Sequence, residues 1–417
     1  MRWPPFLIFL CACQSRLSSP FVVNIAVWGA LDPVGPASAS TSTYAQYWVF
    51  EQLARFDERG QLVPRLASRV ERRGARRYYV ELRGDHSFSD GTTVTSADVE
   101  RSLRANGIRM MAAGAGFLLE PVEATAPLEI LLARSLIFRQ KAGRLMGSGP
   151  LAVVEEMRDR IHLARRSTTP GRISDVFLIA YATPRDAFTH TLRGDANLIP
   201  EPDPRWLEFF AGVPRLRLIV GAGRQTDSIA FNLEQSKEDR VALAKAITSS
   251  SVPEMAFGGG CAEARNRATT DTPIRPGPKL DLLSWPSMER FALAVRRRLG
   301  ERGGEVLQLP LDEVLTRVRR KQFELVTARA QQWPPAMAAF LWRTGAPGNL
   351  FGYSNPAVDA TLDAEDWAAA AAALEKDPPE AFVCTRDRTA VVDARIKNAT
   401  LGPYDLLETL PDWEVGQ

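Results

Sequence analysis

The sequence is poor in the residues on which most catalytic and metal sites depend. It has three histidines and four cysteines among 417 residues. His86, His162 and His190 fall in a predicted hairpin, strand and helix, without partners ordered as in a catalytic triad. No nucleophile elbow, phosphate-binding loop or metal-ligand spacing is present. These absences argue against an enzyme, a metal site or a bound cofactor.

An excess of one charge is also missing. Lys and Arg number 52 and Asp and Glu 49, which gives a formal net charge of +3. The runs Arg296–Arg298 and Arg319–Lys321 lie in predicted helices and read as solvated faces. The arginines are not interleaved with aromatic residues on one face, as they are in many nucleic-acid-binding proteins. We therefore expect no nucleic-acid partner.

The N-terminus has a short apolar run, Trp3–Ala12, preceded by Arg2. This run is too short to span a bilayer but suits the apolar region of a secretion signal. It ends in Leu10-Cys11-Ala12-Cys13, which resembles a bacterial lipobox. On this interpretation residues 1–12 are removed, Cys13 is diacylated, and residues 13–20 tether the protein to a membrane of the cell envelope, facing the periplasm. The alternative is an ordinary cleaved signal with an incidental cysteine.

Few cysteines remain in the predicted mature protein. If Cys11 is removed and Cys13 lipidated, only Cys261 and Cys384 are left. Two cysteines in an exported protein could pair as a structural disulfide.

The segment from Tyr47 to Ser102 has clear local patterns. Residues 76–82 alternate between apolar and polar, which predicts a strand. Ser89-Asp90-Gly91-Thr92 predicts a tight turn, because glycine accepts positive φ. Thr95 and Asp98 are spaced as a capping box and predict the start of a helix. The segment is therefore a folded α/β unit, with no chemistry evident in it.

A second regular unit lies between residues 279 and 327. Strands are predicted at 279–285, 305–309 and 323–327. Between them lie two predicted helices, the first capped by Ser287 with Met288, Phe291 and Val295 on its apolar face, the second at 312–320. Alternating strands and helices at this spacing indicate a parallel sheet with helical crossovers.

Other segments are less regular. Phe21–Trp28 reads as a buried strand, and Leu216–Val220 and Ser228–Asn232 read as two further strands. Between residues 102 and 145 the pattern weakens, with strand-like pieces in Val122–Leu132.

Several segments together resemble one family. Val63–Ala67, Val80–Arg83, Ser89–Thr92 and Ala97–Val99 occur in the order found in the family 5 extracellular solute-binding proteins. The segment from Gly352 to Asp359 resembles a further family segment. These proteins are the oligopeptide-, dipeptide- and nickel-binding components of ABC importers. The chain resembles a divergent and shortened member.

The resemblance implies a periplasmic-binding-protein fold. This is a two-lobed α/β fold with mixed sheets, flanking helices, an extra subdomain in lobe I and a ligand cleft between the lobes. It implies a monomer that hinges around its ligand. The expected boundaries are 21–232 for lobe I, with its subdomain at about 46–146, then 233–386 for lobe II and 387–417 for a return to lobe I.

The resemblance also implies positions for ligand contacts. The loop after the first strand faces the ligand in the family, which makes Ser42, Thr43 and Tyr44 candidate wall residues. Where peptide-binding members place an Asp that holds the ligand's α-ammonium, this chain has Gln331. A neutral amide gives no counter-charge, so a free N-terminus is a poor fit. The remaining candidates are Arg224, Trp333 and Asn349, each of which has an alternative structural role.

The expected function is the capture of peptides or another small polar ligand for an ABC permease in the inner membrane. The alternative is an orphan accessory or sensory lipoprotein that keeps the fold without high-affinity transport. A secreted hydrolase is a weaker alternative.

Overall fold

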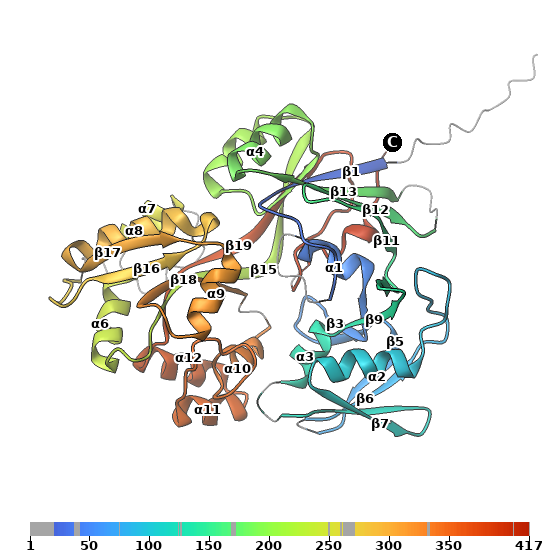
Figure 1. The fold of residues 1–417 in the computed structure, drawn as a ribbon, viewed down its shortest axis with the longest axis horizontal. Coiled ribbons are helices and arrows are strands. Elements are labelled where there is room, and N and C mark those ends of the chain that lie inside the picture. Colours follow the sequence, from blue (N-terminus) through green and yellow to red (C-terminus); the bar gives the residue numbers. More distant parts are fainter. Residues whose placement is uncertain are drawn as a thin grey trace, which may run out of the picture.

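The computed structural model shows two lobes joined by two long strands (Figure 1). It describes residues 21–36, 42–74, 76–123, 125, 127–167, 172–248, 251–258, 261, 272–331, 334–402 and 404–416. The predicted signal sequence, Cys13 and Trp333 lie outside the described residues, as does the side chain of Arg224.

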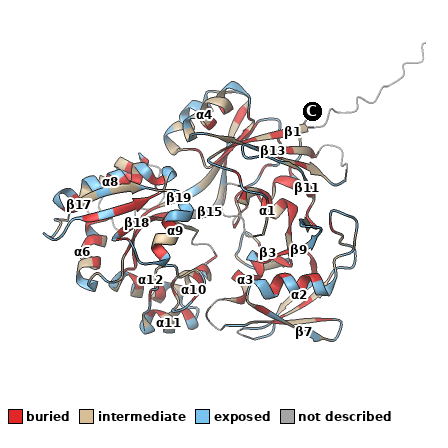
Figure 2. Ribbon diagram, in the orientation of Figure 1, coloured by how far each residue is buried: buried red, intermediate tan, exposed pale blue. Residues whose placement is uncertain are grey.

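One ten-stranded sheet runs through both lobes in the order β11-β12-β13-β1-β14-β19-β15-β18-β16-β17. Its strands are β1 (Phe21–Trp28), β11 (Leu151–Glu156), β12 (Arg160–Arg165), β13 (Ile173–Tyr181), β14 (Leu198–Pro200), β15 (Leu216–Phe231), β16 (Leu280–Ser284), β17 (Gly303–Gln308), β18 (Leu325–Gln331) and β19 (Glu380–Asp393). Buried residues concentrate along these strands and on the inner helix faces (Figure 2).

The two central strands, β15 and β19, pass from one lobe to the other (Figure 1). The prediction of two short strands at 216–220 and 228–232 was therefore wrong, because β15 is one strand of 16 residues. The glycine-containing segment between them reads as a break in sequence. The chain stays extended there because β19 pairs with it on both sides of a register shift between Val220 and Arg224.

Lobe I is built on the parallel pair β1 and β13. Val23, Ile25 and Val27 are buried on one face of β1 and Ala26 on the other, as expected for a strand covered on both faces. The helices of this part are α1 (Thr43–Val49), α4 (Pro184–Arg193) and α5 (Leu207–Ala211). The last part of the chain returns to this core, where Leu406 and Trp413 are buried beside β1.

A subdomain with its own core completes lobe I. Its sheets contain β2 (Glu51–Gln52), β3 (Ala54–Phe56), β4 (Leu62–Pro64), β5 (Ala67–Arg72), β6 (Tyr78–Leu82), β7 (Ile108–Ala113), β8 (Gly116–Pro121), β9 (Leu136–Lys141) and β10 (Arg144–Gly147). The helices are α2 (Ser96–Ala105) and α3 (Leu128–Arg134). The predicted capping box is confirmed, since Asp98 accepts a hydrogen bond from the Thr95 backbone N–H over 3.0 Å.

The interpretation of Val122–Leu132 as strand-like was wrong. β8 ends at Pro121, and α3 begins at Leu128. Five of the seven residues of α3 are buried, so its apolar residues show no helical stripe. A short apolar run of this kind cannot be assigned to a strand or a helix from periodicity alone.

Lobe II has the predicted parallel unit, because β16 pairs in parallel with both β17 and β18. Its helices are α6 (Lys237–Ile247), α7 (Ser251–Phe257), α8 (Glu289–Leu299), α9 (Leu311–Arg319), α10 (Met337–Trp342), α11 (Pro356–Asp363) and α12 (Trp367–Lys376). Met288, Phe291 and Val295 are buried as predicted. Ser287 does not cap α8, because Pro286–Met288 form a 3-10 turn ahead of it.

The two remaining cysteines meet in the lobe II core. Cys261 and Cys384 are joined by a disulfide with a Cα–Cα distance of 5.3 Å, across 123 residues of sequence. Both are buried, and Cys384 lies on β19. The bond therefore ties a long segment of lobe II to one of the strands that link the lobes.

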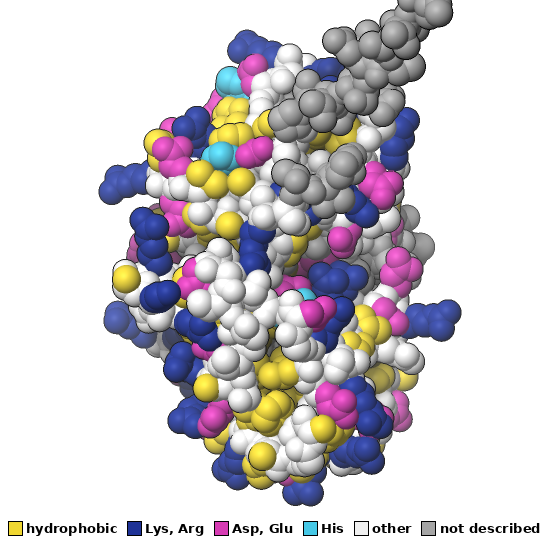
Figure 3. Space-filling view, turned by 90° about the vertical axis from the view of Figure 1, so that its right-hand side faces the viewer, with side chains coloured by type: hydrophobic (Ala, Val, Ile, Leu, Met, Phe, Trp, Pro, Cys, Tyr) yellow, Lys and Arg dark blue, Asp and Glu magenta, His cyan; other side chains and the backbone are white. Residues whose placement is uncertain are grey.

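The surface carries charges of both signs. On the face seen in Figure 3, basic and acidic side chains are interspersed rather than separated into patches. Such mixing gives no strong field of one sign over this face. No helix within the described ranges combines the length and apolar content needed to cross a membrane.

Candidate ligand site between the lobes

Helix α10 belongs to lobe II, yet it touches lobe I. Met337 and Phe340 are buried in the subdomain core, whereas Trp342 packs among the residues of α11 and α12. A cavity of about 470 Å³ adjoins this interlobe contact. It is lined by residues of both lobes: Pro36, Thr43, Gln46, Tyr47, Arg134, Leu136, Gln331, Arg388, Tyr404 and Asp405.

Two of the candidate residues from the sequence line this cavity, Thr43 and Gln331. Tyr44 lies behind the wall, where its hydroxyl donates to Glu201 over 3.4 Å. Ser42 is fully buried at the start of α1, and its carbonyl accepts from the Ala45 N–H. The loop after β1 therefore contributes Thr43 to the cavity, while Ser42 and Tyr44 support it.

Asn349 lies elsewhere, in the turn that precedes α11. Its side-chain amide donates to the carbonyls of Arg343 and Tyr353 over 3.0 and 2.7 Å. Its oxygen accepts from the Tyr353 N–H over 2.9 Å. These bonds give Asn349 a structural role in the turn, and it does not line the cavity. For Arg224 and Trp333 the described atoms give no side-chain position.

A buried ion-pair cluster crosses the linking strands next to the cavity. Asp227 of β15 is completely buried. It accepts hydrogen bonds from Arg329 Nε of β18 over 2.6 Å and from Arg386 Nε of β19 over 2.8 Å. A buried carboxylate needs such partners, because leaving its charge unpaired is costly. Three strands are thus held in register by one acidic side chain.

Glu201 and Arg388 form a second ion pair, and Arg388 lines the cavity. Glu201 follows β14 with a left-handed φ of 46°, a conformation that costs a non-glycine residue about 1–2 kcal/mol. Its carboxylate accepts from Arg388 Nε over 3.0 Å. Burial would raise the pKa of Glu201, but Arg388 and Arg329 outweigh burial and hold that pKa below its usual value. Glu201 is therefore ionised and neutralises part of the positive charge of Arg388.

Arg134 is the cation of the cavity that lacks an acidic partner. It is exposed at the C-terminal end of α3, and no carboxylate of the described residues lies within ion-pair distance. Its guanidinium contacts the Tyr404 hydroxyl at 3.5 Å and lies 5.0 Å from the ring centroid of Phe340. Arg134 therefore presents an uncompensated positive charge to anything bound in the cavity.

Asp405 changes the charge of the cavity near neutral pH. Burial raises its pKa to about 7, despite the opposing charge of Arg388 and a hydrogen bond from the Leu407 N–H. Below that pH Asp405 is protonated and the arginines dominate the cavity. The site is thus suited to a ligand with an anionic group, and more so at mildly acidic pH.

The residues that give the cavity its charge were missed by the sequence analysis. Arg134 ends a helix that was read as strand-like, and Asp405 lies in the C-terminal segment that returns to lobe I. A usable signal was present in β19. Arg386 and Arg388 are two residues apart in β19, which places two positive charges on one face of the strand near the sheet centre. Buried charges of this kind mark functional-site candidates.

The histidines have local roles. His162 Nε2 lies 2.8 Å from Asp175 on the neighbouring strand, and His190 Nδ1 lies 2.7 Å from Asp195 at the end of α4. His162 also stacks on Phe177. Among the described residues, no group of three or more His, Cys, Asp or Glu side chains is arranged to hold a metal ion.

The fold has two lobes that share one sheet, with a cavity lined by residues of both. No family model matches the sequence, and no curated protein matches it either. Solved structures do match, over nearly the whole chain.

The oligopeptide-binding protein AppA from Bacillus subtilis, in complex with a nonapeptide, is 13% identical with a TM-score of 0.79, covering 95% of this chain and 99% of its own. AgaA from A. tumefaciens R10, in complex with agropinic acid, is 17% identical with a TM-score of 0.79 and the same coverage, 95% and 99%. NikA from Staphylococcus aureus, in complex with Ni(L-His)2, is 13% identical with a TM-score of 0.75, covering 92% and 97%.

These similarities confirm the predicted fold class. At such low identity they establish the fold and leave the ligand open. The ligands of the three proteins differ in size and chemistry. The ligand of this chain therefore has to be argued from its own cavity.

Proposed function

We propose that this chain is a solute-binding component of an ABC importer, related to the family 5 proteins, that encloses a small polar ligand between its lobes. The fold and the interlobe position of the cavity support this role. A ligand that touches both lobes stabilises the closed arrangement, because only there are all its contacts made.

The ligand in this proposal carries a carboxylate or similar anionic group. The observation behind this is Arg134, which faces the cavity without an acidic partner among the described residues. An arginine can hold a carboxylate with two parallel hydrogen bonds. Gln331, which also lines the cavity, offers neutral hydrogen bonds and no charge for an ammonium group. An acid without a free α-ammonium is thus the favoured ligand.

The proposed location is the bacterial cell envelope. Cys13 would carry the lipid anchor, and a permease in the inner membrane would receive the ligand. Replacement of Cys13 by Ala should abolish labelling by a fatty-acid analogue in cells. Labelling that persists would contradict the lipoprotein assignment and leave the binding role untouched.

The first experiment is native mass spectrometry of the chain from Gln14 onward, purified from a bacterial periplasm. We expect a discrete additional mass that disappears on denaturation, and fragmentation would identify the ligand. A clean apo mass, together with no thermal shift against small acids and peptides, would contradict importer function. That result would favour the accessory or sensory lipoprotein.

The carboxylate is tested with N-acetyl dipeptides as free acids and as matched amides. We expect the acids to bind more tightly, and Arg134→Gln to remove the difference, with a loss of about tenfold or more in affinity. Arg144→Gln is the control, because Arg144 is exposed on β10 and does not line the cavity. Equal binding of acids and amides would show that the anionic group is not recognised.

A further inference from the structure

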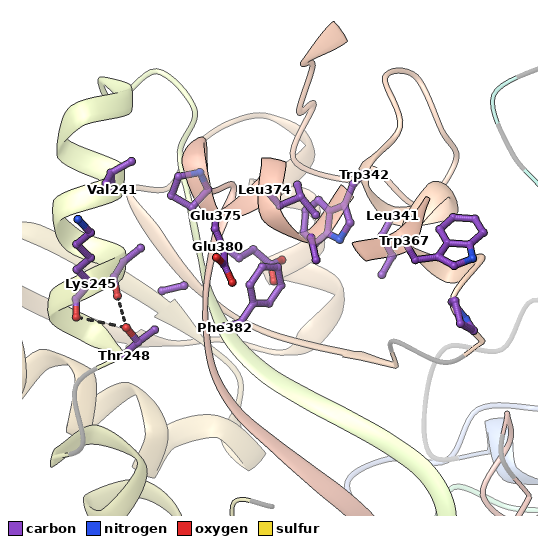
Figure 4. Close-up of a pocket in the computed structure, with 16 residues that line it drawn as sticks. Val241, Lys245, Thr248, Leu341, Trp342, Trp367, Leu374, Glu375, Glu380 and Phe382 are labelled. Carbon is purple, nitrogen blue, oxygen red and sulfur yellow. Dashed lines mark hydrogen bonds between the residues drawn. The ribbon is translucent and has the colours of Figure 1, made fainter. Parts of the chain in front are cut away.

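Lobe II contains a second cavity, of about 400 Å³, between α6, α10, α12 and the first residues of β19 (Figure 4). It shares no lining residue with the interlobe cavity. Its walls are largely apolar. Trp342, Leu374 and Phe382 line it from three different elements, and Val241 of α6 lies opposite. Size and lining are those of a small-molecule site rather than a packing gap.

A single buried carboxyl group lies among these apolar walls. Glu380 is only 3% exposed, and its side chain lies inside the ring of lining residues in Figure 4. Oε2 accepts a hydrogen bond from Ser228 Oγ over 2.5 Å. No hydrogen bond from a described residue reaches Oε1. The carboxyl therefore keeps an acceptor available on the cavity side.

No cation of the described residues pairs with Glu380. The other charged residues that line the cavity are Lys245 and Glu375. Lys245 forms no ion pair with Glu380, and Glu375 is exposed. Burial without a counter-charge raises the pKa of Glu380 to about 7. A buried acid that is not paired with a cation is electrostatically complementary to a ligand that brings one.

We propose that this cavity is a second binding site, which takes a small organic amine with an apolar body. The ammonium group donates to Glu380, and the apolar body packs against Trp342, Leu374 and Phe382. This site is separate from the interlobe site and does not depend on the proposed transport function. Charge complementarity selects the ammonium, and the aromatic walls select an apolar body of modest size.

The test uses phenethylamine as the probe, with phenylpropionate as a control of similar size and opposite charge. Isothermal titration calorimetry on the purified protein should show binding of the amine and not of the acid. Glu380→Gln, which keeps an acceptor for Ser228, should weaken amine binding by about tenfold or more. Glu301→Gln, an exposed carboxylate of lobe II that does not line the cavity, should leave the affinity unchanged.

A second variant and a proton count keep the test decisive. Ala371→Trp places a large side chain of α12 in the cavity and should abolish binding, although Glu380 itself is unchanged. Binding near neutral pH should release protons, because the ammonium ionises Glu380, and the release should disappear in Glu380→Gln. Failure of the wild-type protein to bind the amine, equal binding of phenylpropionate, or unchanged affinity in Glu380→Gln would each overturn the proposal.

Discussion

At the scale of single residues, Glu380 makes the stability of the protein depend on pH. Its pKa is raised from 4.5 to about 7, so the folded state holds the proton more tightly than the unfolded state. This contribution is fully present below about pH 4.5 and is lost as the pH rises through about 7. Glu380→Gln removes the ionisation. The free energy of unfolding of the variant, relative to that of the wild type, should therefore increase by about 1–3 kcal/mol from about pH 5 to about pH 8.

Thermal unfolding of the variant and the wild type, measured at about pH 5 and at about pH 8, checks this prediction. The variant and the wild type should have similar melting temperatures at the lower pH, and the variant should be higher at the upper pH. Glu375→Gln provides the control, since Glu375 is exposed. A wild type that outperforms Glu380→Gln at alkaline pH would contradict the assigned direction of the pKa shift.

Asp405 makes the affinity for a ligand in the interlobe cavity depend on pH. Its pKa of about 7 means that a negative charge appears in the interlobe cavity as the pH rises through neutrality. Affinity for a carboxylate ligand should then fall, by about tenfold for about 1.4 kcal/mol of like-charge repulsion. Asp405→Asn should flatten the profile of dissociation constant against pH. An unaltered profile in the variant would assign the titration to another group.

At the scale of secondary structure, the linking strands depend on Asp227. Asp227→Asn keeps the shape of the side chain but removes the negative charge that pairs with the guanidinium groups of Arg329 and Arg386. We expect a loss of about 3–5 kcal/mol in the free energy of unfolding, measured in urea. The control is Glu313→Gln, which breaks an exposed pair with Arg317 on α9 and should change stability by about 0.5 kcal/mol or less. Losses of equal size in both variants would show that the buried cluster has no special role.

Regular local patterns made much of the fold predictable. The parallel unit of lobe II and the capped helix α2 follow from periodicity and capping residues. Helix α3 does not follow from periodicity, because most of its residues are buried and its apolar residues form no stripe. The middle of β15 does not follow either, because it is extended only through its pairing with β19. The residues of the candidate site were harder to predict than the fold. Arg134 and Arg388 come together only through tertiary structure, and nothing next to either in sequence marks it as a cavity residue.

At the scale of the whole molecule, Phe340 links the two lobes. It extends from α10 of lobe II into the subdomain core of lobe I, where it is 8% exposed and lies against Arg134. This burial exists only while the lobes approach each other. Phe340→Ala should remove about 2 kcal/mol from the closed arrangement and shift the equilibrium about 30-fold toward the open one.

Small-angle X-ray scattering without added ligand measures this shift. The radius of gyration should increase in Phe340→Ala, because separated lobes are less compact. Leu374→Ala is the matched control, since Leu374 is 5% exposed within lobe II and makes its contacts in that lobe. The control should lower stability and leave the radius unchanged. If both variants keep the wild-type radius, then α10 does not hold the lobes together, and closure depends on the ligand and the strands β15 and β19 instead.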